Sequence, residues 1–446
     1  MTTTAEATDR CQARRRRFPR LAGWLGLTLA LASPQNGPAA DWPAYRGAQG
    51  DGISPETIPP SWPATGLKRL WRADTPGGFS SFVVAGNRAF TVVNQGAGNA
   101  AAETCVAFDA ATGKQLWATP TGRAQYPGGG DSGAAGNRGG DGPRSTPATD
   151  GQRVWVYSSA LVLHCLDAAT GKGLWQKDIA AAHAGRNIDW KSALSPMVEG
   201  PLVLIAGGGP GQALLAFRKD TGDLAWKSGD APMTYASPVM ATLHGQRQAL
   251  FLLQSGLVAV HPQTGARLWD FPVPHRTATA CSPVVAGDLV FCTAGYEVGG
   301  TVCAVNRQGD TFAAREVWRH RGNARAASLW STPVHHAGYL YGMISFKQYG
   351  DGPLKCLDLR TGDVRWQQPG FGAGNVILAG QHLIALSDDG HLVLVEANPE
   401  AYREKGRFKA IAGKCWSTPA LANGRLYVRS TKEGACFELS AAPSAP

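Results

Sequence analysis

Two motifs typical of electron-transfer proteins are missing from this sequence. None of its nine cysteines is adjacent to another, and Cys-x-x-Cys-His does not occur, which excludes a covalently attached haem of the c type. The Gly-x-x-x-x-Gly-Lys-Ser/Thr pattern of a phosphate-binding loop is absent as well. The apolar run over residues 21–32 is too short to span a bilayer comfortably as a permanent helix.

The first forty residues have the organisation of an export signal. Five arginines between residues 14 and 20 precede the apolar run, and small residues follow it up to Ala40. Cleavage after Ala32 fits the small-x-small rule, and cleavage after Ala40 is the alternative. The arginine-rich start also resembles a twin-arginine export signal. Because Cys11 precedes the apolar run, we do not place it as a lipoprotein cysteine, and we expect a periplasmic or extracellular protein.

Loss of this signal changes the charge balance of the protein. The whole chain carries +10, and residues 1–40 contribute +4 of it, so the mature chain carries about +6. No run of Lys or Arg remains to form a nucleic-acid surface. We therefore expect no nucleic-acid partner and no transmembrane span after removal of the signal.

A repeated segment organises most of the remaining chain. Residues 107–117 read Ala-Phe-Asp-Ala-Ala-Thr-Gly-Lys-Gln-Leu-Trp, and related copies, some with a rewritten turn, recur along the sequence. Each copy predicts two short strands around a tight turn, in which the Gly supplies a positive φ. The aromatic residue that ends each copy recurs every 42 to 58 residues, which is the period of four-stranded propeller blades.

The tryptophan of each copy predicts a contact between neighbouring sheets. Burying such a ring removes about 150–250 Å² from water, so a Trp at a fixed offset is best explained as a wedge between blades. The residues predicted to dock the blades in this way are Trp71, Trp117, Trp175, Trp226, Trp269, Trp318 and Trp366.

The two ends of the repeat region complete one another. The segment around Trp71 matches the last strand of a blade with no earlier strands before it, whereas residues 417–439 supply three strands and no fourth. Pairing these fragments would hide both sheet edges and close the ring. We predict an all-β fold over residues 67–446, an eight-bladed propeller of four-stranded antiparallel blades. Residues 41–66 form an extended lead-in that we expect to lie against the surface.

A second repeated signal marks the innermost strands. Ser/Thr-Pro precedes a short apolar run and a Gly turn in six blades, and Ser81-Phe82 and Asn375-Val376 replace it in the first and seventh. The loops that enter these strands would surround the mouth of the central channel, where a binding site would lie.

Together these motifs resemble the repeat of the pyrroloquinoline quinone (PQQ)-like propellers. That superfamily contains the quinoprotein alcohol dehydrogenases and the outer-membrane assembly scaffold lipoprotein, and the resemblance covers roughly residues 67–440. The segment Trp42-Pro43-Ala44-Tyr45-Arg46-Gly47 is similar to the lead-in of many short exported members. The resemblance implies the fold, whereas activity depends on a site grafted onto it.

The dehydrogenases of this superfamily imply a specific set of cofactor groups. They use PQQ, a calcium or lanthanide ion on carboxylate and amide oxygens, an Asp base and a disulfide between adjacent cysteines. This chain lacks the adjacent cysteines, and Asp189, Asn187 and Glu297 are the only oxygen ligands it offers near the channel. We therefore predict no cofactor and no catalytic residue, with PQQ and calcium only under the alternative of an alcohol or sugar dehydrogenase.

The candidate ligand-binding residues come from the loops around the predicted mouth. Aromatic and cationic groups there suit a planar anionic ligand or a sugar, although packing alone explains each Trp about equally well. The Gly-rich loop over residues 128–143 is interpreted as a cover. The candidates are Arg144, His183, Arg186, Asn187, Asp189, Trp190, Lys191, Tyr235, Arg276, Trp330, Lys347 and Trp416.

The cysteines and histidines predict little chemistry of their own. Cys165, Cys356 and Cys436 occupy the small-residue position of the repeat, which favours packing inside a blade. Cys281 and Cys292 are the best candidate disulfide pair, across a two-residue turn. No carboxylate or Cys at ligand spacing accompanies His335 and His336, so we predict no structural metal.

Three functions remain open for such a chain. The first, which we favour, is an exported non-catalytic module that binds an envelope protein, a peptide or a glycan on its loop face, as a monomer. The second is a quinone-dependent oxidoreductase. The third is a structural spacer in an envelope assembly, whose contacts would lie on the blade edges instead of at the channel.

Overall fold

The computed structural model describes residues 40–96, 98–126 and 142–439. By its internal contacts the chain divides into Met1–Gln35 and Asn36–Pro446, and the fold belongs to the second unit. The predicted export signal up to residue 39 and residues 127–141 of the Gly-rich loop lie outside the described residues. Within the described ranges, no helix combines the length and apolar character needed to cross a membrane.

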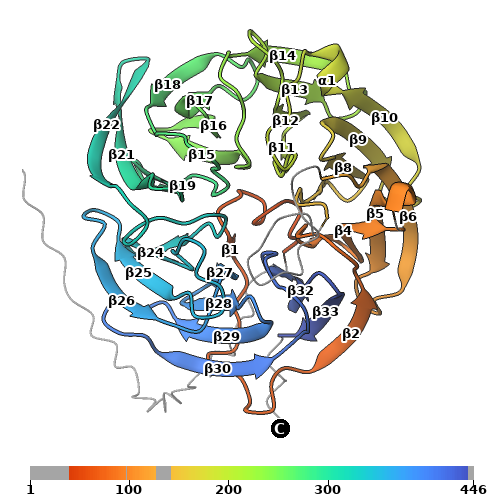
Figure 1. Ribbon diagram of the computed structural model, residues 1–446, viewed down its shortest axis with the longest axis vertical. Coiled ribbons are helices and arrows are strands. Elements are labelled where there is room, and N and C mark those ends of the chain that lie inside the picture. Colours follow the sequence, from red (N-terminus) through yellow and green to blue (C-terminus); the bar gives the residue numbers. More distant parts are fainter. Residues whose placement is uncertain (1–39, 97, 127–141, 440–446) are drawn as a thin grey trace, which may run out of the picture. The chain divides into compact units, whose positions relative to one another are not determined.

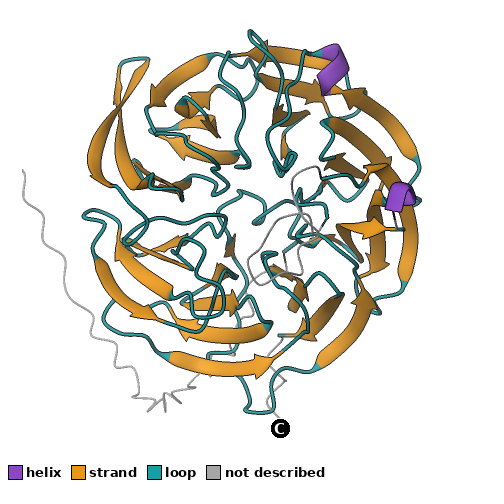
Figure 2. Ribbon diagram, in the orientation of Figure 1, coloured by secondary structure: helices purple, strands orange, loops and turns teal. Residues whose placement is uncertain are grey.

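Eight antiparallel sheets stand around a central axis, as Figures 1 and 2 show, which confirms the predicted all-β, eight-bladed propeller. Each blade runs from an inner strand to an outer strand on the rim. Blade 1 consists of β3 (Val83–Ala85), β4 (Arg88–Gln95), β5 (Ala102–Asp109) and β6 (Gln115–Arg123), and blade 2 of β7 (Ala148–Thr149), β8 (Arg153–Tyr157), β9 (Val162–Asp167) and β10 (Gly173–Asp178). Blade 3 consists of β11 (Met197–Glu199), β12 (Leu202–Ala206), β13 (Leu214–Arg218) and β14 (Leu224–Ser228), and blade 4 of β15 (Val239–Leu243), β16 (Gln246–Leu253), β17 (Gly256–Val260) and β18 (Arg267–Phe271).

Blades 5 to 8 follow the same order along the chain, and the lead-in adds one strand to blade 7. Blade 5 consists of β19 (Val284–Ala286), β20 (Leu289–Ala294), β21 (Gly299–Gln308) and β22 (Thr311–His320), and blade 6 of β23 (Val334–His336), β24 (Tyr339–Gly342), β25 (Leu354–Asp358) and β26 (Val364–Gln368). Blade 7 consists of β27 (Asn375–Ala379), β28 (His382–Leu386), β29 (His391–Glu396) and β30 (Glu404–Lys409), with β1 (Ile53–Ser54) parallel to β27. Blade 8 consists of β31 (Ala420–Ala422), β32 (Arg425–Arg429), β33 (Glu433–Glu438) and β2 (Arg69–Asp74). The described helices are α1 (Ile179–Ala182) and the 3₁₀ turn η1 (Gly98–Ala100).

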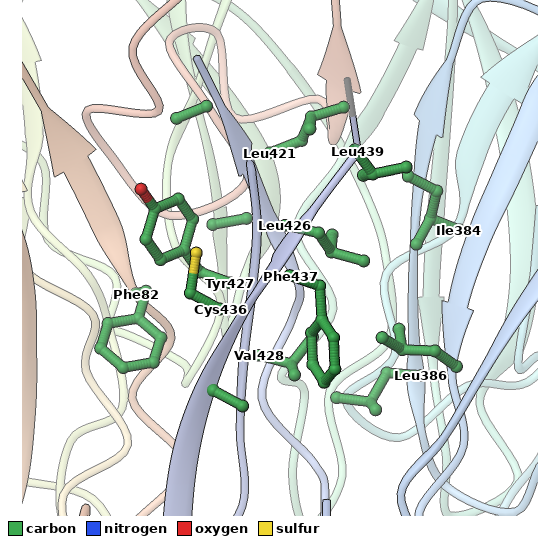
Figure 3. Packing of buried hydrophobic residues seen from close by; sticks show 14 of the residues in the cluster. Phe82, Ile384, Leu386, Leu421, Leu426, Tyr427, Val428, Cys436, Phe437 and Leu439 are labelled. Carbon is green, nitrogen blue, oxygen red and sulfur yellow. The ribbon is translucent and has the colours of Figure 1, made fainter. Parts of the chain in front are cut away.

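Blade 8 closes the ring with strands from both ends of the propeller. Strand β2 pairs antiparallel with β33, and Trp71 lies opposite Cys436. Figure 3 shows the packing around this blade, where Phe82 of blade 1 and Leu386 of blade 7 approach side chains of β32 and β33. The predicted closure is confirmed, because strands from both ends of the propeller belong to one sheet.

A β-bulge positions the repeated tryptophan in the outer strands of seven blades, all except blade 7. In blade 1, Gln115 pairs with Phe108 and Trp117 pairs with Ala107, so Leu116 is the extra residue and points to solvent. The same shift occurs between the third and fourth strands of every blade. Because a bulge re-aims the side chains that follow it, Trp117 turns inward over the small Ala107.

In blades 1, 2 and 6 an Asp side chain of the turn before the tryptophan bonds to the backbone of that turn. In blade 2, the Asp167 carboxylate accepts hydrogen bonds from the backbone of Ala169 and from the backbone and hydroxyl of Thr170. These bonds lower the pKa of Asp167, because they favour the charged carboxylate. Gly171 then adopts a φ of +73°, a conformation that favours glycine.

This turn receives the tryptophan of the preceding blade. The indole N–H of Trp117 donates to the carbonyl of Ala168 at 3.1 Å, and a Cβ on Gly171 would lie 2.6 Å from the indole ring. The same bond to the following blade is made by Trp71, Trp175, Trp226, Trp318 and Trp366. The Asp-x-x-Thr-Gly turn and the Trp are therefore two halves of one contact between blades.

Trp269 differs from the others because the turn of the following blade is rewritten. Strands β21 and β22 are ten residues long each, and the turn that joins them contains Gly309. A Cβ at Gly309 would meet nothing within 4 Å, so no described tryptophan packs against this turn. The Trp269 indole instead donates to the Gln248 side chain of its own blade at 2.7 Å. Beside it, Arg319 of β22 donates to the Pro272 carbonyl and so ties the long hairpin to blade 4.

The described cysteines are all buried free thiols. Cys165, Cys356 and Cys436 each lie opposite the blade tryptophan, where a small side chain leaves room for the ring, as the sequence analysis predicted. The suggested disulfide is wrong. The closing pair of that hairpin is Ala286 with Leu289, and continuing this register would bring Cys292 opposite Pro283 and not opposite Cys281.

The inner strands are linked by a collar of hydroxyl groups around the channel. The backbone N–H of Thr146 donates to the Ser195 hydroxyl, and that of Ser195 donates to the Ser237 hydroxyl, both at 2.9 Å. Similar bonds continue to blades 5 and 6 and pass from blade 8 through blade 1 to blade 2. In blade 7, where the motif departs, Asn375 donates from its amide side chain to the Trp416 carbonyl. The Ser/Thr of the repeated motif thus supplies a bond between neighbouring blades.

Candidate functional site

A cavity of about 460 Å³ lies where the channel opens among the loops that enter the inner strands. Its walls come from every blade except blade 7, together with one residue of the lead-in. The residues that line it are Tyr45, Phe79, Ser81, Arg144, Trp190, Ala193, Ser195, Tyr235, Ser237, Ala278, Ala280, Tyr296, Leu329, Trp330, Lys347, Trp416 and Thr418.

The lead-in crosses the channel and forms the floor of this cavity. The N–H of Trp42 donates to Val84 in blade 1, whereas Arg46 donates to the carbonyls of Thr332 and Pro333 at 2.8 Å in blade 6. Trp42 and Arg46 are fully buried, so the expectation that this segment lies against the surface is wrong. Figure 1 shows the segment near β1 passing through the middle of the ring. It makes the channel blind, with Tyr45 at the bottom.

One wall of the cavity is a stack of aromatic rings from blades 1, 6 and 8. The ring centroids of Trp330 and Trp416 are 4.5 Å apart, and Phe79 lies 4.8 Å from Trp416. Tyr349 stacks on both tryptophans at 6.2 and 5.7 Å. The Trp330 indole donates to the Ala373 carbonyl at 3.0 Å, which fixes the ring against blade 7. The wall is therefore an aromatic surface, and the Lys414 ammonium lies 4.3 Å from the Trp416 ring centroid.

The facing wall comes from the loops that enter blades 3 and 4. Trp190 and Tyr235 stack with centroids 6.4 Å apart, and the Tyr235 hydroxyl donates to the Asp189 carbonyl. Arg144 donates to the Trp190 carbonyl at 2.5 Å, so a cation holds this loop from the side of blade 2.

Two cationic side chains line the cavity, and no described carboxylate does. Lys347 lies with its ammonium 5.0 Å from the Tyr296 ring centroid and 5.3 Å from that of Phe346. Arg144 is the second cation. Burial raises the pKa of Tyr45, Tyr235 and Tyr296, so these phenols stay neutral at physiological pH. The described lining is thus aromatic and net positive.

The backbone of the rim is strained at three lining residues. Trp190, Tyr296 and Lys347 have φ values of +60°, +56° and +53°, in a region that residues with a Cβ seldom occupy. Such conformations cost on the order of 1–3 kcal/mol each and persist where the surroundings over-determine them, often at binding sites. Here they direct an indole, a phenol and an ammonium group to one cavity.

Six of the twelve candidate residues line the cavity, and six do not. The first group was selected mainly by position, two residues before the Ser/Thr of the inner-strand motif. The residues at the cavity are Arg144, Trp190, Tyr235, Trp330, Lys347 and Trp416. The residues placed elsewhere are His183, Arg186, Asn187, Asp189, Lys191 and Arg276.

The second group has structural contacts or faces solvent. His183 caps α1 and contacts Gln212 at 3.2 Å, and Asn187 donates to the Ser159 carbonyl at 2.7 Å. Arg186 and Arg276 are exposed. These residues do belong to loops that enter the inner strands, as predicted. Their position in the sequence does not determine whether their side chains point into the cavity.

The sequence analysis missed three aromatic lining residues, Tyr45, Phe79 and Tyr296. Phe79 lies two residues before Ser81, so the offset that selected Trp330 and Trp416 also applies to it. Tyr296 belongs to the loop between β20 and β21, which corresponds in blade 5 to the loop that carries Lys347 in blade 6. No local pattern identifies Tyr45, because its place depends on the path of the lead-in through the channel.

The described lining does not fit PQQ held with a divalent cation. Such a pair needs carboxylate or amide oxygens at the metal, and the described cavity wall has neither. Asn187 bonds to Ser159, and Glu297 accepts from Asn323 outside the cavity. No group of three His, Cys, Asp or Glu residues arranged for a metal occurs in the part of the chain that the structure describes.

Comparison with known proteins identifies the family of this propeller. The family model described as outer membrane protein assembly factor BamB matches residues 101–368. BamB of Yersinia pestis is 24% identical over 266 residues, which is 56% of this chain and 64% of that relative, so the match spans less than two thirds of the relative's length.

Solved structures share the fold at low sequence identity. BamB from Moraxella catarrhalis superposes with a TM-score of 0.59 and 14% identity, over 85% of this chain and 99% of that one. Quinohemoprotein alcohol dehydrogenase ADHIIG from Pseudomonas putida HK5 gives a TM-score of 0.64 and 13% identity, over 91% of this chain and 81% of the enzyme. Identities this low establish the architecture alone. On the strength of the family match across most of its blades, this chain belongs to the BamB-type family of PQQ-like propellers.

Proposed function

We propose that this protein is an exported, non-catalytic binding module of the cell envelope, which holds an envelope protein, peptide or glycan at the cavity on its loop face and acts as a monomer. One observation carries the proposal: a blind aromatic cavity with two cations, three of whose lining residues have strained backbones. The family and its named members in outer membrane protein assembly support an envelope role of the scaffold type.

A quinone-dependent dehydrogenase has the same architecture and is the alternative. The aromatic walls and cations would suit a planar anion, but the described lining offers no oxygen ligands for a metal partner. We therefore expect purified mature protein to show no dye reduction with alcohols or sugars in the presence of PQQ and calcium. Turnover with a saturable PQQ dependence would establish the alternative.

The binding role is tested by photo-crosslinking in cells. A photoreactive amino acid at Lys347 on the cavity rim is compared with one at Leu224, an exposed residue of the outer strand β14. Adducts of defined mass are expected at Lys347 and not at Leu224. Adducts confined to Leu224 would point to a spacer that is held by its blade edges, and a protein retained in the cytoplasm would refute the proposal altogether.

A further inference from the structure

The blind end of the cavity restricts which part of a ligand can enter. Because the lead-in crosses the channel with Tyr45 at the bottom and Arg46 buried beneath, a chain cannot thread through. A volume of about 460 Å³ has room for roughly the last two residues of a peptide and not for a folded domain. The cavity therefore suits the end of a chain.

The charge of the lining distinguishes between the two ends of a chain. An N-terminal amine would need a carboxylate or free carbonyl partner, and no described carboxylate lines the cavity. Lys347 carries the opposite charge to a C-terminal carboxylate, and no described carboxylate lies within ion-pair distance of its ammonium. The electrostatic match is with a C-terminus.

The walls decide what precedes that carboxylate. Trp190, Trp330 and Trp416 all line the cavity, and indole rings suit contact with a ring-bearing side chain. A glycan fits less well, because it needs many polar partners and the lining hydroxyl oxygens of Ser195 and Ser237 already accept backbone N–H bonds from neighbouring blades.

We infer that the cavity binds the C-terminal end of a partner protein, with an aromatic terminal side chain between the tryptophan walls and the terminal carboxylate at Lys347. This inference rests on the proposed function and names the part of the partner that is recognised. It assigns Trp190, Trp330 and Trp416 to the side chain and Lys347 to the charge.

The test uses purified mature protein and a fluorescently labelled seven-residue peptide that ends in phenylalanine with a free carboxylate. Binding is measured by fluorescence anisotropy. We expect saturable binding that weakens about fivefold when the C-terminus is amidated, which is the size of one partly exposed ion pair. Replacing the terminal phenylalanine by alanine should weaken binding by tenfold or more, because the peptide then has no ring to contact the tryptophans of the two walls.

Variants then locate the carboxylate. Lys347→Met should weaken the free-acid peptide about fivefold and leave the amidated peptide unchanged, whereas Arg186→Met, which removes an exposed cation outside the cavity, should change neither. Equal affinity of acid and amide in the unmodified protein would overturn the inference without any variant. N-acetylphenylalanine binding as tightly as the peptide would overturn it too, since a small aromatic acid would then be the ligand. Cellular crosslinks at Lys347 with no peptide binding would leave the envelope role intact and remove only the C-terminal recognition.

Discussion

Gly171 shows how one residue of the repeat joins two blades. Its φ of +73° closes the turn of blade 2, and the absence of a side chain lets the Trp117 ring of blade 1 approach. Gly200 has a similar φ of +56° in the turn after β11, but a Cβ there would meet nothing within 4 Å. The pair separates the cost of the backbone conformation from that of the contact.

We expect Gly171→Ala to destabilise the protein by about 2–4 kcal/mol and Gly200→Ala by about 1 kcal/mol. Each alanine must adopt the left-handed backbone conformation, which costs roughly 1 kcal/mol. Only the alanine at residue 171 must also displace the Trp117 indole, which costs roughly 1–3 kcal/mol more. Urea unfolding of the two variants measures the difference. Equal losses would mean that the Trp117 contact contributes nothing to blade docking.

For single residues, the sequence predicts those contacts that form between neighbours in the chain. The Asp-x-x-Thr-Gly turn forms from the bonds of its own side chains, so its pattern alone predicts it. The pairing of Cys281 with Cys292 failed because strand register depends on where the turn closes, and a shift of one residue redirects every side chain.

Among the elements, blade 8 contacts blade 1 through the buried side chain of Arg429 as well as through Trp71. Arg429 of β32 is 1% exposed and donates to the Thr91 hydroxyl and the Val92 carbonyl at 2.8 and 2.7 Å. It also donates to the carbonyls of Thr75 and Gly77, which follow β2. The guanidinium thus connects the closing strands to the first complete blade.

Arg429→Met should destabilise the protein by about 3 kcal/mol or more, because buried acceptors are left without donors at about 1–3 kcal/mol each. Arg425→Met, at the other and more exposed end of β32, should cost less than about 1 kcal/mol. Chemical denaturation gives the two values, and hydrogen exchange should show faster opening of β2 and β33 in the Arg429 variant. Unchanged exchange there would show that strand pairing alone holds the ring closed.

The strands of the blades could be predicted from the sequence, whereas the position of the lead-in could not. Strand pairs and their order followed from the repeat, because each blade repeats one local pattern. The lead-in was misplaced because Trp42 and Arg46 lack periodic neighbours, and only the assembled channel offers Thr332 and Pro333 as partners. Tyr45 was missed as a lining residue for the same reason.

For the whole molecule, several partly buried histidines couple folding to pH. Burial lowers the pKa of His164, His275, His335 and His382 below the usual value of about 6.5. The unfolded chain then binds protons at a higher pH than the folded protein does. Stability is therefore fully present above pH 6.5 and is lost as the pH falls below it.

We expect the free energy of unfolding to fall between pH 7 and pH 5, and His164→Gln to reduce that slope. His164 is suited to the test because its Nε2 is buried without a hydrogen-bond partner, so a proton there finds no acceptor. Urea titrations at pH 7, 6 and 5 on both proteins provide the measurement. A slope that is unchanged in the variant, or stability that rises toward pH 5, would contradict the assignment.

The sequence by itself determined the propeller, its eight blades and its closure, since each depends on short patterns that recur: a turn, a tryptophan and a Ser/Thr at an inner strand. It also identified six of the seventeen residues that line the cavity, because one offset in the repeat brings residues such as Trp330 and Trp416 to a common opening. Tertiary structure alone decided that the channel is blind, that Tyr45 forms its floor and that Lys347 faces Tyr296. Those features join segments far apart in the chain, and no local pattern records which side chains meet there.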